Sequence, residues 1–104
     1  NRLQISGNTE DVMAHDDLCE RWSSFGWNVI NVADGNDIDQ LKAAFDAAKE
    51  VKGKPTMVIA NTVKGKGSSI MENKANWHHK VPNAEELAQI KKDLAERKEA
   101  ALHG

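Results

Sequence analysis

WNVINVADGNDIDQLKAAFDAAKEVKGKPTMVIA, residues 27 to 60, decides the fold class of this chain. Its first six residues are rich in β-branched side chains, which predicts a strand over 27 to 32. A turn around Gly35 then leads into a predicted helix over 37 to 51. The run from 56 to 60 is almost wholly apolar, which is typical of a strand that is covered on both faces. Strand, helix and strand in this order predict parallel strands packed against helices, so the expected fold class is α/β.

Caps and apolar spacing refine this prediction. We expect Asn36 to cap the helix over 37 to 51, and a further helix over 15 to 25 to precede the first strand. Asn83, with Glu86 three residues later, predicts a capping box at the start of a last helix. The predicted buried stripe of the central helix consists of Ile38, Leu41, Phe45 and Ala48. The predicted aromatic core or interface positions are Trp22, Phe25 and Trp27.

Composition narrows the classes of function. The 104 residues allow one domain with a thin core, since 39% of them are hydrophobic. The 14 basic and 16 acidic residues give a net charge of −2, which argues against a nucleic-acid partner. A single cysteine, Cys19, excludes an internal disulfide and favours a reducing, cytoplasmic location. No apolar run approaches the roughly 20 residues of a membrane span, so we expect no membrane partner. Because the chain begins at Asn1 and not at methionine, we expect it to be a piece of a larger protein.

A long loop over 62 to 82 follows the second predicted strand. Its roughly 20 residues lack periodicity and far exceed the usual connection of about 5, and ligands of parallel sheets bind where the strands end. Gly65 and Gly67 would let the backbone approach a ligand, while Lys64 and Lys66 would supply charged donors to phosphate oxygens. A solvated surface loop is the competing interpretation, and the spacing alone leaves both open.

Two other places carry candidate ligands. His78 and His79 would point in opposite directions on an extended chain, which makes them poor joint metal ligands. One histidine that binds a phosphate and an ordinary exposed histidine are both compatible with the pattern. At the other end, the Asn1 side-chain oxygen and the Leu3 carbonyl are the kind of ligands that Mg²⁺ accepts, although the pair alone is a weak signal.

Three separated blocks of the chain together resemble the transketolase family. They are NRLQISG, FGWNVINVADGNDI and GKPTMVIANTVKGKGSSIMENKANWHHKVPN. In that family they form the second half of the thiamine-diphosphate-binding N-terminal region, and the likeness is greatest to the separate N-terminal subunit of split bacterial and archaeal transketolases. The resemblance implies that residues 1 to 104 are a single partial domain, the C-terminal half of a three-layer, parallel-sheet, thiamine-diphosphate-binding fold. Residues 62 to 82 would be its cofactor-side loop.

The same resemblance implies roles for individual residues. Asn1 would ligate Mg²⁺ (or Ca²⁺) through its side chain, and Leu3 would ligate the same ion through its backbone carbonyl. His78 would contact the diphosphate and the substrate side, and it is the one catalytic candidate. The implied cofactor contacts are Ile5, Lys64, Gly65 and His78. The family has glycine after this histidine, where the chain has His79.

The activity implied by the resemblance is that of a transketolase of the pentose phosphate type. The parent protein would transfer a two-carbon ketol unit between sugar phosphates with thiamine diphosphate and Mg²⁺. Its expected partners are sugar-phosphate substrates, a C-terminal transketolase subunit or domain, and further copies of itself in a homo-oligomer. The family's G-D-G metal motif is missing, so we expect the chain alone to be inactive. The alternatives are a non-catalytic α/β binding or regulatory module and a relative of deoxyxylulose-phosphate synthase, although the W-H-x-K block favours transketolase over the latter.

Overall fold

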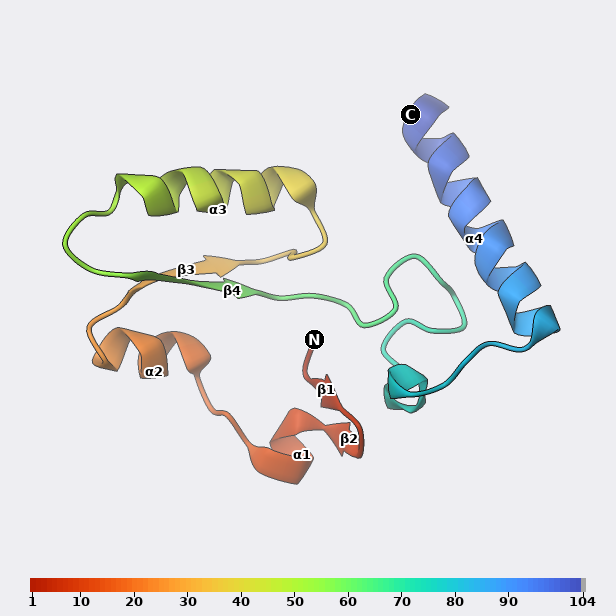
Figure 1. Cartoon of the computed structure of the whole chain (residues 1–104), viewed down its shortest axis with the longest axis horizontal. Coiled ribbons are helices and arrows are strands. Elements are labelled where there is room, and N and C mark those ends of the chain that lie inside the picture. Colours follow the sequence, from red (N-terminus) through yellow and green to blue (C-terminus); the bar gives the residue numbers. More distant parts are fainter. Residues whose placement is uncertain (104) are drawn as a thin grey trace. The chain divides into compact units, whose positions relative to one another are not determined.

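The computed structural model describes residues 1 to 103, and the chain divides into two compact units. The first unit joins Asn1–Val12 to the chain from Val63 onward, and the second unit is Met13–Thr62. The elements in chain order (Figure 1) are β1 (Leu3–Gln4), β2 (Gly7–Asn8), α1 (Thr9–Met13), α2 (Leu18–Ser24), β3 (Asn28–Val32), α3 (Ile38–Glu50), β4 (Thr56–Ala60), the 3-10 helix η1 (Ala75–His78) and α4 (Ala84–His103).

The second unit is a parallel strand pair between two helices. β3 and β4 run side by side with Asn28 opposite Thr56 and Val32 opposite Ala60. In Figure 1, α3 lies along one face of this pair and α2 along the other, and both helices contact the strands. The prediction of parallel strands covered on both faces is therefore confirmed, and so is the α/β fold class.

Two of the three predicted helix starts differ from the structure in detail. Asp37, not Asn36, caps α3: its Oδ1 accepts the N–H groups of Asp39 and Gln40 at 2.9 and 3.3 Å. Asn36 is instead held in the preceding turn, where its N–H donates to Asp34 Oδ1 at 2.9 Å. α2 begins three residues later than predicted, because the Asp17 side chain accepts the N–H of Glu20 at its N-terminus.

The third helix start confirms its prediction. Asn83 Oδ1 accepts the N–H of Glu86 at 2.8 Å, and the Glu86 carboxylate accepts the N–H of Asn83 at 3.0 Å. These reciprocal bonds form the predicted capping box at the start of α4.

Replacing the cap of α3 tests its role in stability. Asp37→Ala is expected to lower the melting temperature by a few degrees, because two N–H groups lose their acceptor. Asp37→Asn is the matched control, since it keeps the side-chain oxygen.

The N–H and side chain of Gln40, with the N–H of Asp39, hold the pKa of Asp37 below its ordinary 3.8. The stabilisation that the ionised Asp37 carboxylate adds to the cap is therefore present above pH 3.8. It is lost as pH falls through the lower pKa of the folded state. Thermal unfolding of the unmodified protein and of the two variants between pH 2 and about pH 7 measures both effects. Equal melting temperatures for Asp37→Ala and Asp37→Asn at about pH 7 would show that the side-chain oxygen does not stabilise the helix.

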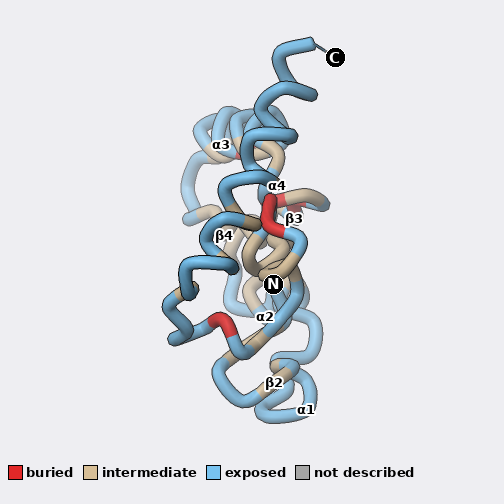
Figure 2. The backbone as a smooth tube through the Cα atoms, turned by 90° about the vertical axis from the view of Figure 1, so that its right-hand side faces the viewer, coloured by how far each residue is buried: buried red, intermediate tan, exposed pale blue. Residues whose placement is uncertain are grey.

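Few of the described residues are buried, as the short red segments of Figure 2 show. The buried apolar residues are Val32, Ala44 and Trp77. The predicted stripe of α3 is wrong at two positions, because Ile38 is 79% exposed and Phe45 is 53% exposed. With 100° between successive helical residues, the face that packs on the strands centres on Ala44, flanked by Leu41 and Ala48. Ile38 and Phe45 fall to one side of that face.

Of the two positions predicted for the aromatic side chains, core or interface, Phe25 does not take the core one, and its interface role stays a prediction. Phe25 is 80% exposed, because it is the C-cap of α2 and lies just past the helical turn. Trp22 and Trp27 do pack together, with ring centroids 4.8 Å apart in an edge-to-face arrangement.

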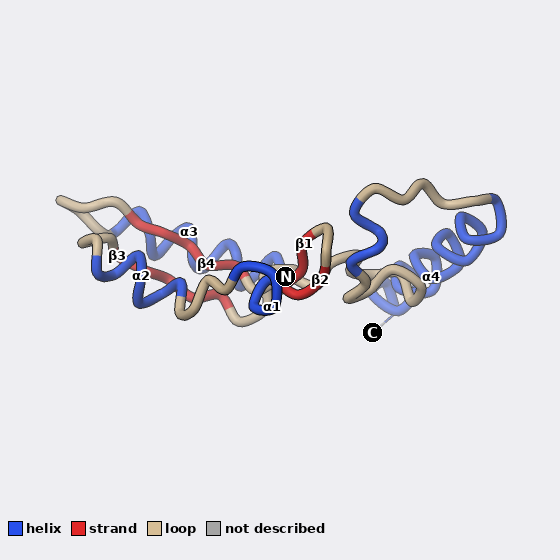
Figure 3. Tube along the Cα trace, turned by 90° about the horizontal axis from the view of Figure 1, so that it is seen from below, coloured by secondary structure: helices blue, strands red, loops and turns tan. Residues whose placement is uncertain are grey.

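The first unit contains the N-terminal hairpin, the long loop and α4. β1 and β2 are antiparallel, with Leu3 opposite Asn8, and both are coloured red in Figure 3. β1 contacts η1, the short helix near the end of the loop. Among residues 1 to 103, no helix combines the length and the apolar character that a membrane crossing requires.

Candidate functional site

The loop after β4 is closed by its own backbone. The Lys64 carbonyl accepts the N–H of Asn73 at 3.0 Å, and the Gly65 carbonyl accepts the N–H of Ser68 at 3.1 Å. The Ser68 carbonyl in turn accepts the N–H of Glu72 at 3.0 Å. Lys64 and Gly65 therefore stand at the neck of a hydrogen-bonded loop and are not part of a loose connection. We call residues 64 to 73 the glycine–lysine loop.

Glycine is required at position 65 for two reasons. Its φ of +70° lies in the left-handed region, which other residues adopt at a cost. A Cβ placed there would also lie 2.6 Å from Met71 Cβ and 2.8 Å from the Met71 carbonyl carbon. The neck of the loop is thus packed against the returning backbone, and only a residue without a side chain fits.

Asp93 of α4 binds the outer side of the loop. Its Oδ2 accepts both the N–H and the hydroxyl of Ser69, at 2.6 and 2.7 Å, and its Oδ1 accepts Gln89 Nε2 at 2.6 Å. The hydroxyl and the N–H of Ser69, followed by Gln89, lower the pKa of Asp93 below its ordinary 3.8. The carboxylate is therefore ionised at neutral pH.

Glu72 makes a second link inside the same loop. Its Oε1 accepts the N–H of Gly67 at 2.9 Å and lies 4.0 Å from Arg97 Nη1 of α4. Between these two links lies a groove that is shared by the loop and the helix. It is lined by Gly67, Ser69, Glu72, Asp93, Glu96 and Arg97.

The histidine pair lies at the end of η1, next to a buried tryptophan. Trp77 Nε1 donates to the Ile70 carbonyl at 2.9 Å, and Lys80 Nζ lies 4.4 Å from the centre of the Trp77 ring. The prediction that His78 and His79 point in opposite directions is wrong: their rings meet edge to face, with centroids 4.6 Å apart. The reason is that His78 ends a tight helical turn and not an extended strand. His79 has an ordinary φ of −120°, so the backbone there does not require the glycine of the family pattern.

The N-terminal turn presents oxygen atoms. Asn1 Oδ1 accepts the N–H of Leu3 at 2.9 Å, and Arg2 between them adopts a φ of +58°. Carboxamide and carbonyl oxygens suit a hard cation such as Mg²⁺, and the Asn1 oxygen keeps a second lone pair for one. Ile5 is 60% exposed at the tip of the hairpin, where an apolar face is available to a ligand. Within residues 1 to 103, no three histidine, cysteine or acidic side chains form a metal cluster.

The predicted site residues all belong to the first unit. The hairpin carries Asn1, Leu3 and Ile5, the glycine–lysine loop carries Lys64 and Gly65, and η1 carries His78. Contact between β1 and η1 brings the hairpin to the histidine end of the loop. The roles of these residues remain predictions. The sequence did not reveal the links made by Ser69, Glu72 and Asp93, since nothing in the local pattern pairs a serine with an aspartate that is 24 residues away.

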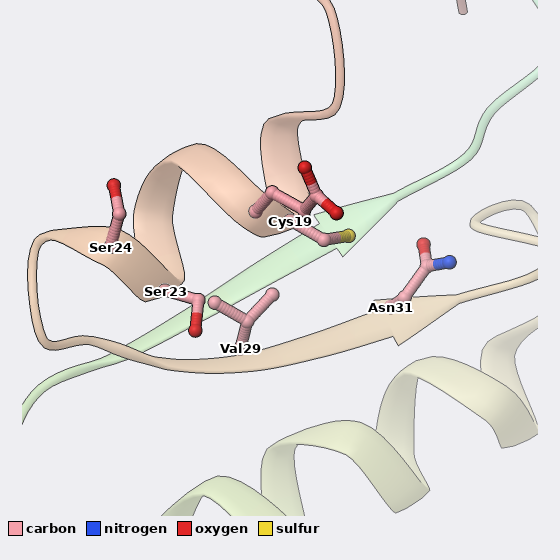
Figure 4. Close-up of a pocket in the computed structure, with 6 residues that line it drawn as sticks. Cys19, Ser23, Ser24, Val29 and Asn31 are labelled. Atoms are coloured by element: carbon pink, nitrogen blue, oxygen red, sulfur yellow. The ribbon is translucent and has the colours of Figure 1, made fainter.

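A separate groove lies in the second unit, between α2 and β3. Figure 4 shows the side chains of Cys19, Val29 and Asn31 directed toward the same space, with Ser23 and Ser24 farther along the helix. Glu20 completes the lining. This groove contains no histidine to activate the thiol, so its residues do not form a nucleophile–base pair.

Comparison with known proteins decides the family. Residues 1–101 match the family model described as "Transketolase, thiamine diphosphate binding domain". This chain belongs to the transketolase family. It is 41% identical over 97 residues to an apulose-4-phosphate transketolase subunit of Phocaeicola vulgatus, a match that covers 93% of the chain and 34% of that protein. It is 39% identical over 79 residues to 6-deoxy-6-sulfo-D-fructose transketolase subunit SqwG of a Clostridium species, which covers 76% of the chain and 28% of that protein.

Solved structures agree with the transketolase assignment. A crystal structure of a Pichia stipitis transketolase complex with sedoheptulose-7-phosphate superposes with a TM-score of 0.62 at 29% identity. The superposition covers 96% of this chain and 18% of that one. The resemblance to split transketolase subunits and the α/β fold are therefore confirmed. The chain spans about a third of the length of its relative from Phocaeicola vulgatus, 34%.

Proposed function

We propose that this chain is part of a transketolase subunit whose parent protein transfers a two-carbon ketol unit between sugar phosphates. The proposal is supported by membership of the thiamine-diphosphate-binding family and by relatives that are named as transketolase subunits. The single observation that carries it is the glycine–lysine loop, whose backbone holds Lys64 and Gly65 at a fixed neck. The left-handed Gly65, packed against the returning backbone, makes this an ordered loop, which favours the proposal over a loosely solvated connection.

The residues of the chain would bind and orient the cofactor. Thiamine diphosphate, when bound, supplies the electron sink for carbanion chemistry. Asn1 Oδ1 and the Leu3 carbonyl would provide oxygen ligands to Mg²⁺ beside the diphosphate. Lys64 would neutralise phosphate oxygens, and the missing side chain of Gly65 would let the backbone approach them.

His78 would act on the substrate side. It is exposed at the end of η1, where a ring N–H would donate to an anionic oxygen. Ile5 would give an apolar contact to the cofactor from the hairpin tip.

The partners of the parent protein follow from the same relatives. Two of them are named as subunits of transketolases, so we propose that a second subunit or domain completes the enzyme. One name includes a sugar phosphate, which supports substrates of that class. Because the matches cover only 34% and 28% of these two relatives, we also propose that the chain lacks activity by itself.

Replacing His78 tests the proposal. In the full-length protein in complex with its partner, His78→Ala is expected to lower ketol transfer at least about tenfold, because a hydrogen bond to a charged group contributes about 1.5–3 kcal/mol. The melting temperature should not change, since the side chain is exposed. Steady-state turnover with a ketose phosphate donor and an aldose phosphate acceptor provides the measurement.

His79→Ala is the matched control, because it removes the neighbouring exposed ring. Its turnover should stay within a few-fold of the unmodified enzyme. Equal losses in both variants would show that the ring pair is structural, and full turnover in His78→Ala would remove His78 from the site. Turnover without added thiamine diphosphate, in enzyme stripped of it, would overturn the proposed function itself.

A further inference from the structure

We propose that Asp93 of α4 is a positioning residue: it holds the glycine–lysine loop in the conformation that presents Lys64 and Gly65 to the diphosphate. The inference rests on the proposed function, and it adds α4 to the parts of the chain on which cofactor affinity depends.

The contact between Asp93 and Ser69 has the geometry of an anchor. One carboxylate oxygen takes two donors from the same residue, a backbone N–H at 2.6 Å and a hydroxyl at 2.7 Å. The bond to the Ser69 N–H fixes the path of the loop backbone, whereas the bond to the hydroxyl alone would fix only the Ser69 side chain. The other oxygen is engaged by Gln89, one turn earlier on α4, which orients the carboxylate. With both oxygens bonded to other groups of the chain, Asp93 is suited to hold the loop.

Two further contacts bring α4 against the same loop. Glu72 bonds the N–H of Gly67 and faces Arg97, and a Cβ added at Gly67 would lie 3.2 Å from Leu94 Cδ2. The loop backbone therefore runs directly against one face of the helix, which carries Asp93, Leu94 and Arg97. The close approach at Gly67 leaves little room for the loop to shift along that face.

The anchor is connected to the neck by hydrogen bonds. Ser68, next to the anchored Ser69, donates its N–H to the Gly65 carbonyl and accepts the N–H groups of Met71 and Glu72 through its own carbonyl. Releasing Ser69 would therefore loosen the turns that define the neck. When only a fraction of molecules hold the binding conformation, the apparent dissociation constant rises by the inverse of that fraction. The expected result is a higher dissociation constant for the cofactor. At saturating cofactor, kcat should be largely restored.

The test compares Asp93→Ala, Asp93→Asn and Glu99→Ala in the full-length subunit with its partner. Glu99 is the matched control, because it is an acid of the same helix that pairs with His103 and not with the loop. Hydrogen exchange of the amides of residues 64 to 73, measured without cofactor, reports the anchor. Calorimetric titration with thiamine diphosphate and Mg²⁺ reports affinity, and kcat at saturating cofactor reports the reaction step.

Asp93→Ala is expected to raise the exchange rates of the Gly67 and Ser69 amides. It should also raise the dissociation constant of thiamine diphosphate about tenfold. The fold loss in kcat should be smaller than the fold loss in affinity. Asp93→Asn should give an intermediate result, since it keeps an acceptor for Ser69. Glu99→Ala should change none of these quantities.

Each other outcome overturns the inference in a distinguishable way. Unchanged exchange in Asp93→Ala would show that Asp93 does not hold the loop. Faster exchange with unchanged affinity would show an anchor that has no bearing on the cofactor. Failure of the unmodified protein to bind thiamine diphosphate would overturn the proposed function, while the exchange data would still decide whether the anchor exists.

Discussion

Gly65→Ala is expected to lower the affinity of the full-length subunit for thiamine diphosphate by about a hundredfold or more. Alanine in the left-handed region costs about 1–2 kcal/mol, and the new methyl group must also displace Met71. Its Cβ would lie 2.8 Å from the Met71 carbonyl carbon, so the obstacle is backbone and not a flexible side-chain end. The loop must open at its neck, where Lys64 and the Gly65 amide are predicted to meet the diphosphate. Calorimetric titration with cofactor and Mg²⁺ measures the loss.

Gly53→Ala separates backbone strain from the close contact at Gly65. Gly53 has a similar φ of +80°, but an added Cβ would meet nothing within 4 Å. This control should destabilise the protein by about 1–2 kcal/mol and leave cofactor affinity unchanged. If Gly65→Ala bound the cofactor as tightly as the Gly53→Ala control, the glycine–lysine loop would not be part of the cofactor site.

The order of the fold could be predicted from sequence because each element is defined locally. The β-branched run at 28 to 32 and the apolar run at 56 to 60 are strands in the structure, and the capping box of Asn83 and Glu86 depends on residues three positions apart. Such patterns depend on near neighbours in the chain. The cap of α3 was misplaced by one residue because Asn36 and Asp37 are equally good caps, and the turn from Asp34 decides between them.

Burial was less predictable because it depends on what surrounds each helix. The periodicity of α3 shows that it has an apolar side, but the angle at which it meets two strands places Ala44, and not Phe45, at the centre of the contact. A two-stranded sheet buries little surface by itself. Exposed apolar side chains on α3 are therefore expected in a chain that spans a third of its relative's length.

The candidate site was predictable only where it resembled a family pattern. Lys64, Gly65 and His78 lie in blocks whose spacing is recognisable, and the structure places them in one unit with Asn1. The anchor between Ser69 and Asp93 joins positions 24 residues apart and depends on the path of the loop, which no local rule describes. The edge-to-face arrangement of His78 and His79 likewise depends on a 3-10 turn that the loop sequence did not reveal.

Trp77→Ala is expected to destabilise the long loop by about 3–5 kcal/mol, the cost of removing a large buried aromatic side chain. Trp77 is 8% exposed and is the one buried apolar residue among those described in the first unit. Its indole N–H also holds the Ile70 carbonyl at 2.9 Å, which ties η1 to the glycine–lysine loop. Hydrogen exchange of the loop amides in the full-length subunit measures the change in local opening free energy, and about 3 kcal/mol corresponds to exchange roughly a hundredfold faster.

Trp77→Phe divides this effect between packing and hydrogen bonding. Phenylalanine keeps most of the ring in the pocket and loses only the bond to Ile70, so its cost should be about 1 kcal/mol. If the two variants opened the loop equally, the hydrogen bond and not the burial would hold η1 in place. If neither changed exchange, Trp77 would not hold the loop in place, and the loop would depend on its own backbone bonds and on its contacts with β1 and α4.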